Sequence, residues 1–138
     1  MKSIDWEALR KAAIEARKHA YAPYSGFPVG AAILANGRIF AGCNIENASH
    51  PVGVCAERVA LSAAVTAGCR SIEAVVVAAI KPVTPCGMCR QALAEFNPKV
   101  PIRMIGGEAE TKATLGQLLP RPFAKVGKPG KPLRKSPA

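Results

Sequence analysis

The chain has 138 residues, of which 49% are hydrophobic and 20% charged, and this balance excludes a wholly disordered protein. No apolar run approaches the ~20 residues of a membrane-spanning helix, and the N-terminus lacks the apolar stretch of a secretory signal. The sequence therefore predicts a cytoplasmic protein with no membrane partner. Five cysteines without a signal peptide favour metal-binding, catalytic or buried free thiols over a disulfide framework.

The formal net charge of +10 is concentrated at the C-terminus, where residues 124–138 hold five basic side chains, three prolines, two glycines and no acid. This composition predicts a folded domain over residues 1–123 and a flexible basic tail over residues 124–138. Aromatic residues make up only 5% of the chain, which is few for a protein that stacks on nucleic-acid bases. A nucleic-acid partner is not expected.

The first half of the chain predicts a helix and a hairpin. Apolar residues recur at three- and four-residue steps from Trp6 to Ala20, as on one face of a helix. Two apolar runs, 29–35 and 38–43, are joined by Asn36-Gly37, the dipeptide that tight hairpin turns prefer. We expect an antiparallel pair of strands here.

The second half alternates helices and strands. Residues 55–67 are alanine-rich and predict a helix, and the β-branched run 72–80 predicts a strand covered on both faces. A helix over 86–96, a strand over 100–105 and a short strand with a helical turn over 111–119 follow. The order α-β-β-α-β-α-β predicts an α/β fold, a three-layer mixed β-sheet with helices on both faces.

Three cysteines stand at predicted helix starts. Cys55 opens one helix, and Cys86 and Cys89 form a C-x-x-C at the start of the next. The positive ends of two helix dipoles lower the pKa of nearby thiols, and thiolates bind zinc well. A structural zinc site needs four protein ligands, whereas a catalytic site keeps three and a water.

The two other cysteines are interpreted as small buried hydrophobes. Cys69 lies beyond the far end of the helix that Cys55 opens, and a helix of that length spans about 20 Å, so Cys69 cannot join the same metal. Distance does not exclude Cys43. The favoured site therefore has three cysteines and an open fourth position.

Glu57 indicates which chemistry accompanies such a site. It lies two residues after Cys55, where a carboxylate can reach a water without ligating the metal. Alternatively, it is an exposed glutamate that the helix dipole stabilises. Next to a three-thiolate zinc, we interpret it as a proton carrier, with Arg58 offsetting the excess negative charge.

Five motifs, in order over residues 5–123, resemble the small homotetrameric zinc-dependent cytidine deaminases. They are FPVGAA at 27–32, GCNIENAS at 42–49, CAER at 55–58, PCGMCRQ at 85–91 and LLPRPF at 118–123. The resemblance implies the deaminase fold and one zinc ion per subunit, held by Cys55, Cys86 and Cys89. Zinc would activate the water that attacks C4 of the pyrimidine, and Glu57 would protonate N3 and then the departing amine.

The resemblance also implies substrate contacts. Phe27 would flank the base, Asn44 and Glu46 would bind the ribose hydroxyls, and the backbone at Ala56 and Cys86 would read the base edge. Asn44 and Glu46 alternate on an extended segment, so their side chains should share one side.

Three further residues have implied roles, one of them, Phe123, in substrate binding. Phe123 would reach into the pocket of a neighbouring subunit, so that active sites are shared within a homotetramer. Arg58 and Gln91 would hydrogen-bond the thiolates or brace the site.

The predicted function is hydrolytic deamination of cytidine and deoxycytidine in pyrimidine salvage, with a small cytosine nucleoside as partner. His50 stands where the family usually has an aromatic residue, and the segment 79–85 is short. These departures keep open a modified cytosine nucleoside, or a cytosine-containing antibiotic such as blasticidin S, as the substrate. Intact Asn44 and Glu46 favour a free ribose.

Two other classes of function remain as alternatives. A polynucleotide-editing deaminase would use the basic tail to hold RNA or DNA, with salt-sensitive binding. A non-catalytic zinc module would have four protein ligands and no role for Glu57.

Overall fold

Five strands form one mixed sheet, in the order β2-β1-β3-β4-β5, in the computed structural model, which describes residues 3–124. The strands are β1 (Gly30–Ala35), β2 (Arg38–Cys43), β3 (Ile72–Ala78), β4 (Pro101–Gly106) and β5 (Ala109–Thr114). β3 and β4 are parallel, and the other neighbours are antiparallel. The predicted mixed sheet is confirmed.

The predicted hairpin joins β1 and β2. Its turn residues Asn36 and Gly37 have φ angles of 49° and 76°, so both occupy the left-handed region that this tight turn requires. The register pairs Gly30 with Cys43 at the open end and Ala35 with Arg38 beside the turn.

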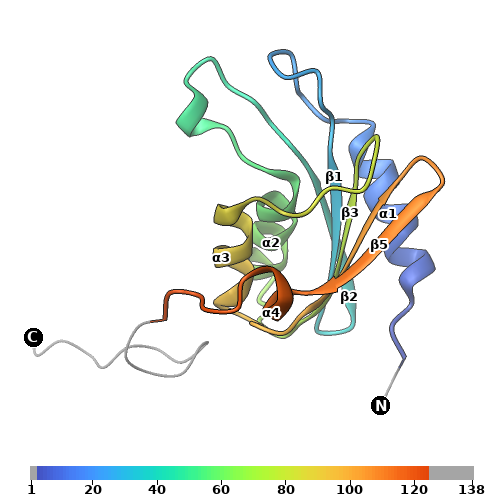
Figure 1. Cartoon of the computed structure of the whole chain (residues 1–138), viewed down its shortest axis with the longest axis vertical. Coiled ribbons are helices and arrows are strands. Elements are labelled where there is room, and N and C mark those ends of the chain that lie inside the picture. The colour runs from blue at the N-terminus through green and yellow to red at the C-terminus, as the bar shows by residue number, and fades with distance from the viewer. Residues whose placement is uncertain (1–2, 125–138) are drawn as a thin grey trace, which may run out of the picture.

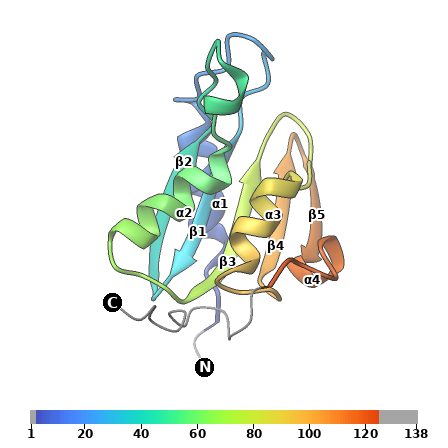
Figure 2. The same cartoon turned by 90° about the vertical axis from the view of Figure 1, so that its left-hand side faces the viewer.

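Helices cover both faces of the sheet. They are α1 (Trp6–Arg17), the 3-10 helix η1 (His50–Val52), α2 (Ala56–Thr66), α3 (Gly87–Ala94) and α4 (Leu115–Leu118). α2 and α3 lie side by side in front of the sheet in Figure 2, and α1 lies behind it. The three-layer arrangement agrees with the sequence prediction.

β3 contributes to a hydrophobic core on each face. Val75 and Val77 pack with Leu61 of α2 and Leu93 of α3, whereas Val76 packs with residues of α1 on the other face. Alternating side chains of one strand thus enter two apolar layers, which explains the continuous β-branched run.

Several predicted boundaries were wrong by a few residues. α1 ends at Arg17, before Ala20, and α3 covers less than the predicted 86–96. Cys55 and Cys86 are N-cap residues, so Cys86 precedes the first turn in which we expected it. Such shifts are expected because patterns of apolar residues do not define helix ends.

One end of the sheet gathers the segments that carry the predicted motifs. Gly30 pairs with Cys43 and also with Ala78, so the loops before β1, after β2 and after β3 leave the sheet at the same end (Figure 1). Cys55 and Cys86 follow two of these loops and begin α2 and α3, respectively.

α2 packs very closely on β2. A Cβ atom on Gly42 would lie 2.6 Å from the backbone nitrogen of Ala60 and 2.8 Å from Cβ of Val59. Glycine at this position lets the helix that begins at Cys55 rest directly on the strand.

Two further predictions concern membrane-spanning helices and the C-terminal tail. Among residues 3–124, no helix combines the length and hydrophobicity needed to cross a bilayer. The predicted tail, 124–138, falls outside the described residues except for Ala124, and its boundary stays a prediction.

Candidate active site

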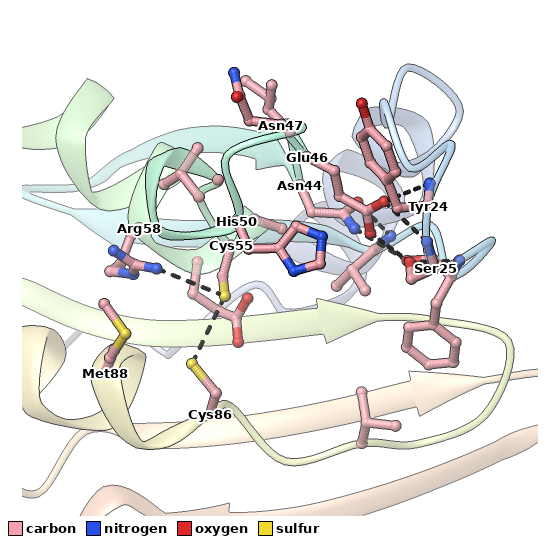
Figure 3. A pocket seen from close by; sticks show the side chains of 18 of the residues that line it. Tyr24, Ser25, Asn44, Glu46, Asn47, His50, Cys55, Arg58, Cys86 and Met88 are labelled. Carbon is pink, nitrogen blue, oxygen red and sulfur yellow. Dashed lines mark hydrogen bonds between the residues drawn. The ribbon is translucent and has the colours of Figure 1, made fainter.

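Three sulfur atoms meet at the start of α2 and α3. The Sγ atoms of Cys55, Cys86 and Cys89 all lie within 4.8 Å of one another; Cys55 and Cys86 are 3.6 Å apart, and Cys86 and Cys89 are 3.5 Å apart. Neither N-cap cysteine makes a side-chain capping bond to the backbone of its helix. Both sulfurs are therefore free to face the shared point (Figure 3).

The cluster fits a tetrahedral zinc ion. With Zn–S bonds near 2.3 Å, ligand sulfurs in tetrahedral geometry are about 3.8 Å apart, close to the two observed separations. Within residues 3–124, no other histidine, cysteine or carboxylate belongs to the cluster, and Cys43 and Cys69 lie outside it. The three thiols leave a fourth coordination position open to a non-protein ligand.

Hydrogen bonds polarise this cluster toward a thiolate. A hydrogen bond from the Cys89 thiol, helped by Arg58, lowers the pKa of Cys55 to about 5, while the bond to Cys55 and burial raise the pKa of Cys89. Nη2 of Arg58 lies 3.8 Å from Cys55 Sγ. A thiolate beside a fixed guanidinium is well suited to hold a divalent cation.

Glu57 is buried in the first turn of α2. Its side chain is only 4% exposed, and it is the one buried charged residue within the described chain. Burial, together with the negative charge of the neighbouring Cys55, raises the pKa of Glu57 to about 7. The alternative interpretation, an exposed helix-start glutamate, is wrong. A carboxyl group with this pKa can both accept and donate a proton near neutral pH.

An open pocket of about 820 Å³ leads to this cluster. Eight of the predicted site residues line it, and so does His50; the eight are Phe27, Asn44, Glu46, Cys55, Ala56, Glu57, Arg58 and Cys86. The pocket therefore joins the sulfur cluster and the predicted substrate contacts in one space.

The Asn44 side chain fixes the loop that carries Phe27. Its Oδ1 accepts a hydrogen bond from the Val29 amide at 2.8 Å, and its Nδ2 donates to the Phe27 carbonyl at 3.0 Å. Phe27 is thus held at the pocket wall by the side chain of the residue that follows β2. Asn44 retains one amide hydrogen and one oxygen lone pair for a ligand.

Glu46 holds the preceding part of the same loop. Its carboxylate accepts hydrogen bonds from the backbone amides of Tyr24 and Ser25, at 2.9 and 3.0 Å, and from the Ser25 hydroxyl. The Ser25 hydroxyl and these amides hold the pKa of Glu46 below its usual range. Asn44 and Glu46 both face this loop, as their alternation predicted (Figure 3).

His50 lies in the pocket wall beside Tyr24. The centres of the two rings are 6.0 Å apart, with 57° between their planes. The His50 residue is exposed, and its imidazole borders the pocket.

Gln91 and Phe123 contact each other and do not line the pocket. The Gln91 amide donates to the Phe123 carbonyl at 2.9 Å and accepts from the Phe123 amide at 3.0 Å. The Phe123 ring is 72% exposed.

Arg90 is a bracing residue that the sequence analysis missed. Its guanidinium donates to the Pro85 carbonyl at 2.7 Å, to the Leu118 carbonyl at 2.8 Å and to the Thr84 hydroxyl at 3.0 Å. These bonds fix the approach to Cys86. No sequence signal distinguishes this arginine from an exposed helical one, and only its position after Cys89 draws attention to it.

The chain is similar to a family model and to named proteins. Residues 3–104 match the model described as the cytidine and deoxycytidylate deaminase zinc-binding region. A cytidine deaminase from Sporosarcina psychrophila is 47% identical over 128 residues, which is 88% of this chain and 93% of that protein. A blasticidin-S deaminase from Bacillus cereus is 30% identical over 108 residues, 70% of this chain and 77% of that protein.

Solved structures include close matches. The crystal structure of cytidine deaminase from Burkholderia pseudomallei superimposes with a TM-score of 0.82 at 42% identity. The match covers 87% of this chain and all of that chain. The likeness thus extends over the sheet, its helices and the loops around the pocket.

Proposed function

Because this chain belongs to the cytidine and deoxycytidylate deaminases with a zinc-binding region, we infer that it is a zinc-dependent hydrolase that deaminates cytidine. The overall reaction adds water to C4 of the base and releases ammonia, so that cytidine becomes uridine. The observation that carries this inference is the meeting of three cysteine sulfurs and one buried glutamate in a single pocket.

The chain binds one zinc ion, and we assign Cys55, Cys86 and Cys89 as its ligands. Zinc supplies Lewis-acid chemistry there, lowering the pKa of water so that hydroxide is available at neutral pH. Arg58 keeps the pKa of the Cys55 thiol low and balances part of the negative charge of three thiolates.

Glu57 is the proton carrier in this proposal. It accepts a proton from the attacking water as the C4–O bond forms, and it delivers that proton to N3 of the base. It then takes the second proton from the new hydroxyl group on C4 and delivers it to the amino group, so that the C4–N bond breaks, the C4 carbonyl forms and ammonia leaves. Its burial, which brings its pKa to about 7, supports both directions of transfer.

The other predicted pocket residues bind and orient the nucleoside. Phe27 packs against the base, and Asn44 and Glu46 bind the ribose hydroxyls with the lone pairs and hydrogen that their loop contacts leave free. The backbone at Ala56 and Cys86 reads the edge of the base. All five residues line the pocket.

Cytidine and deoxycytidine are favoured over blasticidin S as substrates. The cytidine deaminase of Sporosarcina psychrophila is 47% identical to this chain, whereas the blasticidin-S deaminase of Bacillus cereus is 30% identical. A kinetic panel of cytidine, deoxycytidine, 5-substituted cytidines and blasticidin S tests the assignment. Much slower turnover of cytidine than of an analogue contradicts it.

The active unit in this proposal is a homotetramer with shared active sites, acting in cytoplasmic pyrimidine salvage. Large apolar side chains of this chain remain exposed near the pocket and beyond it: Tyr21, Tyr24, Ile45, Val52, Met88 and Phe123. Exposed apolar groups on this scale are characteristic of surfaces that meet a partner. Phe123 enters the pocket of a neighbouring subunit.

Ammonia release from cytidine by the purified protein tests the function directly. Stoichiometric uridine and ammonia, in a sample with one zinc per chain, is the expected result. A protein that holds zinc and binds cytidine but releases no ammonia is instead a non-catalytic zinc module.

A further inference from the structure

Phe123 combines a fixed backbone with an exposed ring. Gln91 binds both the amide and the carbonyl of Phe123, yet 72% of the residue faces solvent. Holding the backbone of this segment in one conformation costs conformational entropy. The exposed ring is thus held in a defined position and is available for a contact outside the described chain.

The segment before Phe123 is stiff. Arg90 donates to the Leu118 carbonyl, and Pro120 and Pro122 restrict the backbone between this anchor and Phe123. Two adjacent side chains of α3 thus hold both ends of the six-residue segment 118–123. The position of Phe123 is consequently set by the same helix that carries Cys89.

The pocket of the same chain is not where the ring goes. Phe123 is absent from the residues that line that pocket, and its backbone is tied to the middle of α3, whereas the sulfur cluster lies at the start of this helix. The proposed function assigns the ring to the pocket of a second copy of the chain.

We propose that Gln91 is a positioning residue for the active site of a neighbouring subunit. It holds Phe123 in the pose in which the ring enters that subunit's pocket, so α3 of one subunit shapes substrate binding in another. This inference rests on the proposed insertion of Phe123 between subunits.

The chemistry of the side chain explains why glutamine suits this task. A primary amide offers a donor and an acceptor in one plane, and it pairs with the amide and carbonyl of a single residue. Methionine has a similar length but neither hydrogen bond. Glutamate keeps an acceptor for the Phe123 amide, but it replaces the donor to the Phe123 carbonyl by a carboxylate oxygen, and the two oxygens repel each other.

Mixed oligomers test the proposal. Subunits carrying Glu57→Gln are co-expressed with subunits carrying Phe123→Ala, under two affinity tags so that only mixed oligomers are purified. Each parent alone has little activity. In the mixture, a Phe123→Ala subunit supplies Glu57 and its neighbour supplies Phe123, so random assortment restores about a quarter of the sites.

Gln91→Met is then placed on one subunit type at a time. On the Glu57→Gln subunit, which donates Phe123, it is expected to lower the restored kcat/KM about fivefold or more, mainly by raising KM for cytidine. On the Phe123→Ala subunit it is expected to change nothing. Gln91→Glu on the donor subunit should give an intermediate loss. Zinc per chain is measured in every mixture and should stay constant.

The outcomes separate the two levels of the argument. No restored activity in the parent mixture overturns the insertion of Phe123 between subunits, which is part of the proposed function. The positioning role of Gln91 is overturned if the parent mixture regains activity and Gln91→Met on the donor subunit leaves that activity unchanged. It is also overturned if Gln91→Met lowers the activity equally when placed on either subunit type. Loss only from the donor subunit supports it.

Discussion

Glu57 is the residue on which the proposed reaction depends most. A carboxyl group next to a thiolate, with 4% of its surface exposed, resists ionisation because both burial and negative charge disfavour the anion. The helix start and Arg58 act in the opposite direction. This balance is suited to a group that must gain and lose a proton in one catalytic cycle.

Glu57→Gln is expected to lower kcat for cytidine by at least about 10²-fold, since the amide cannot carry a proton. Steady-state kinetics measures the loss, and metal analysis with thermal unfolding should show unchanged zinc and fold. Turnover close to that of the parent protein would remove Glu57 from the mechanism.

Ser25 controls the ionisation of Glu46. Its hydroxyl and the loop amides hold the pKa of Glu46 below the ordinary value of about 4.3. The ionised carboxylate therefore stabilises the loop above that pH, and the stabilisation is lost as the pH falls through the lower, folded-state value.

Ser25→Ala is expected to raise the pKa of Glu46 toward its ordinary value. KM for cytidine should then begin to rise at a higher pH in the variant than in the parent when both are acidified from pH 7 to about pH 4. Ser71→Ala, at the opposite end of β3 from the pocket, serves as the control. Identical KM profiles for all three proteins would disconnect Ser25 from substrate binding.

Among the elements, α2 and α3 determine the site because each begins at a cysteine. Their N-caps are extended and their thiols are free of capping bonds, so both helix starts and all three sulfurs converge. The close packing of α2 on Gly42 fixes where this convergence occurs.

Gly42→Ala is expected to destabilise the protein by about 1–3 kcal/mol, because the new methyl group overlaps the backbone of α2. Activity should fall as well, since α2 carries Cys55 and Glu57. Gly116→Ala is the matched control: its nearest contact would be 3.7 Å, an ordinary packing distance. Thermal unfolding at one protein concentration compares them, and equal stability would contradict the packing argument.

The elements were predictable from the sequence to a greater extent than the contacts between them. Asn36-Gly37 predicted a hairpin, and the β-branched run predicted a strand buried on both faces, because each pattern reflects local geometry. Burial of Glu57 was not evident locally, since a glutamate in a first turn is ordinarily solvated.

The bracing contacts could not be predicted because they join distant residues. Asn44 bonds the Phe27 loop, Arg90 reaches Leu118, and Gln91 reaches Phe123. No sequence pattern marks the two partners of any of these contacts, because each contact depends on how the sheet brings distant segments together. The resemblance implied that Gln91 hydrogen-bonds the thiolates or braces the site, whereas its amide pairs with the Phe123 backbone.

At the scale of the whole molecule, the sheet gathers three loops at one end and leaves apolar side chains exposed around the pocket. A single chain thus has its pocket and several exposed apolar side chains in the same region. The proposed homotetramer uses both.

Sedimentation equilibrium is expected to give four times the chain mass of 14.4 kDa. Because Phe123 is exposed in the single chain, Phe123→Ala should weaken association and raise KM for cytidine while leaving zinc binding intact. A monomer with full activity would exclude shared active sites.

The central claim is that a zinc ion held by three cysteines, beside Glu57, performs the deamination. Its most direct test is to remove zinc with a chelator, restore it in steps, and measure ammonia release from cytidine against zinc per chain. Activity should disappear with the metal and return in proportion, levelling off at one zinc per chain. Full activity in protein without zinc, or a need for a second ion, would contradict the account.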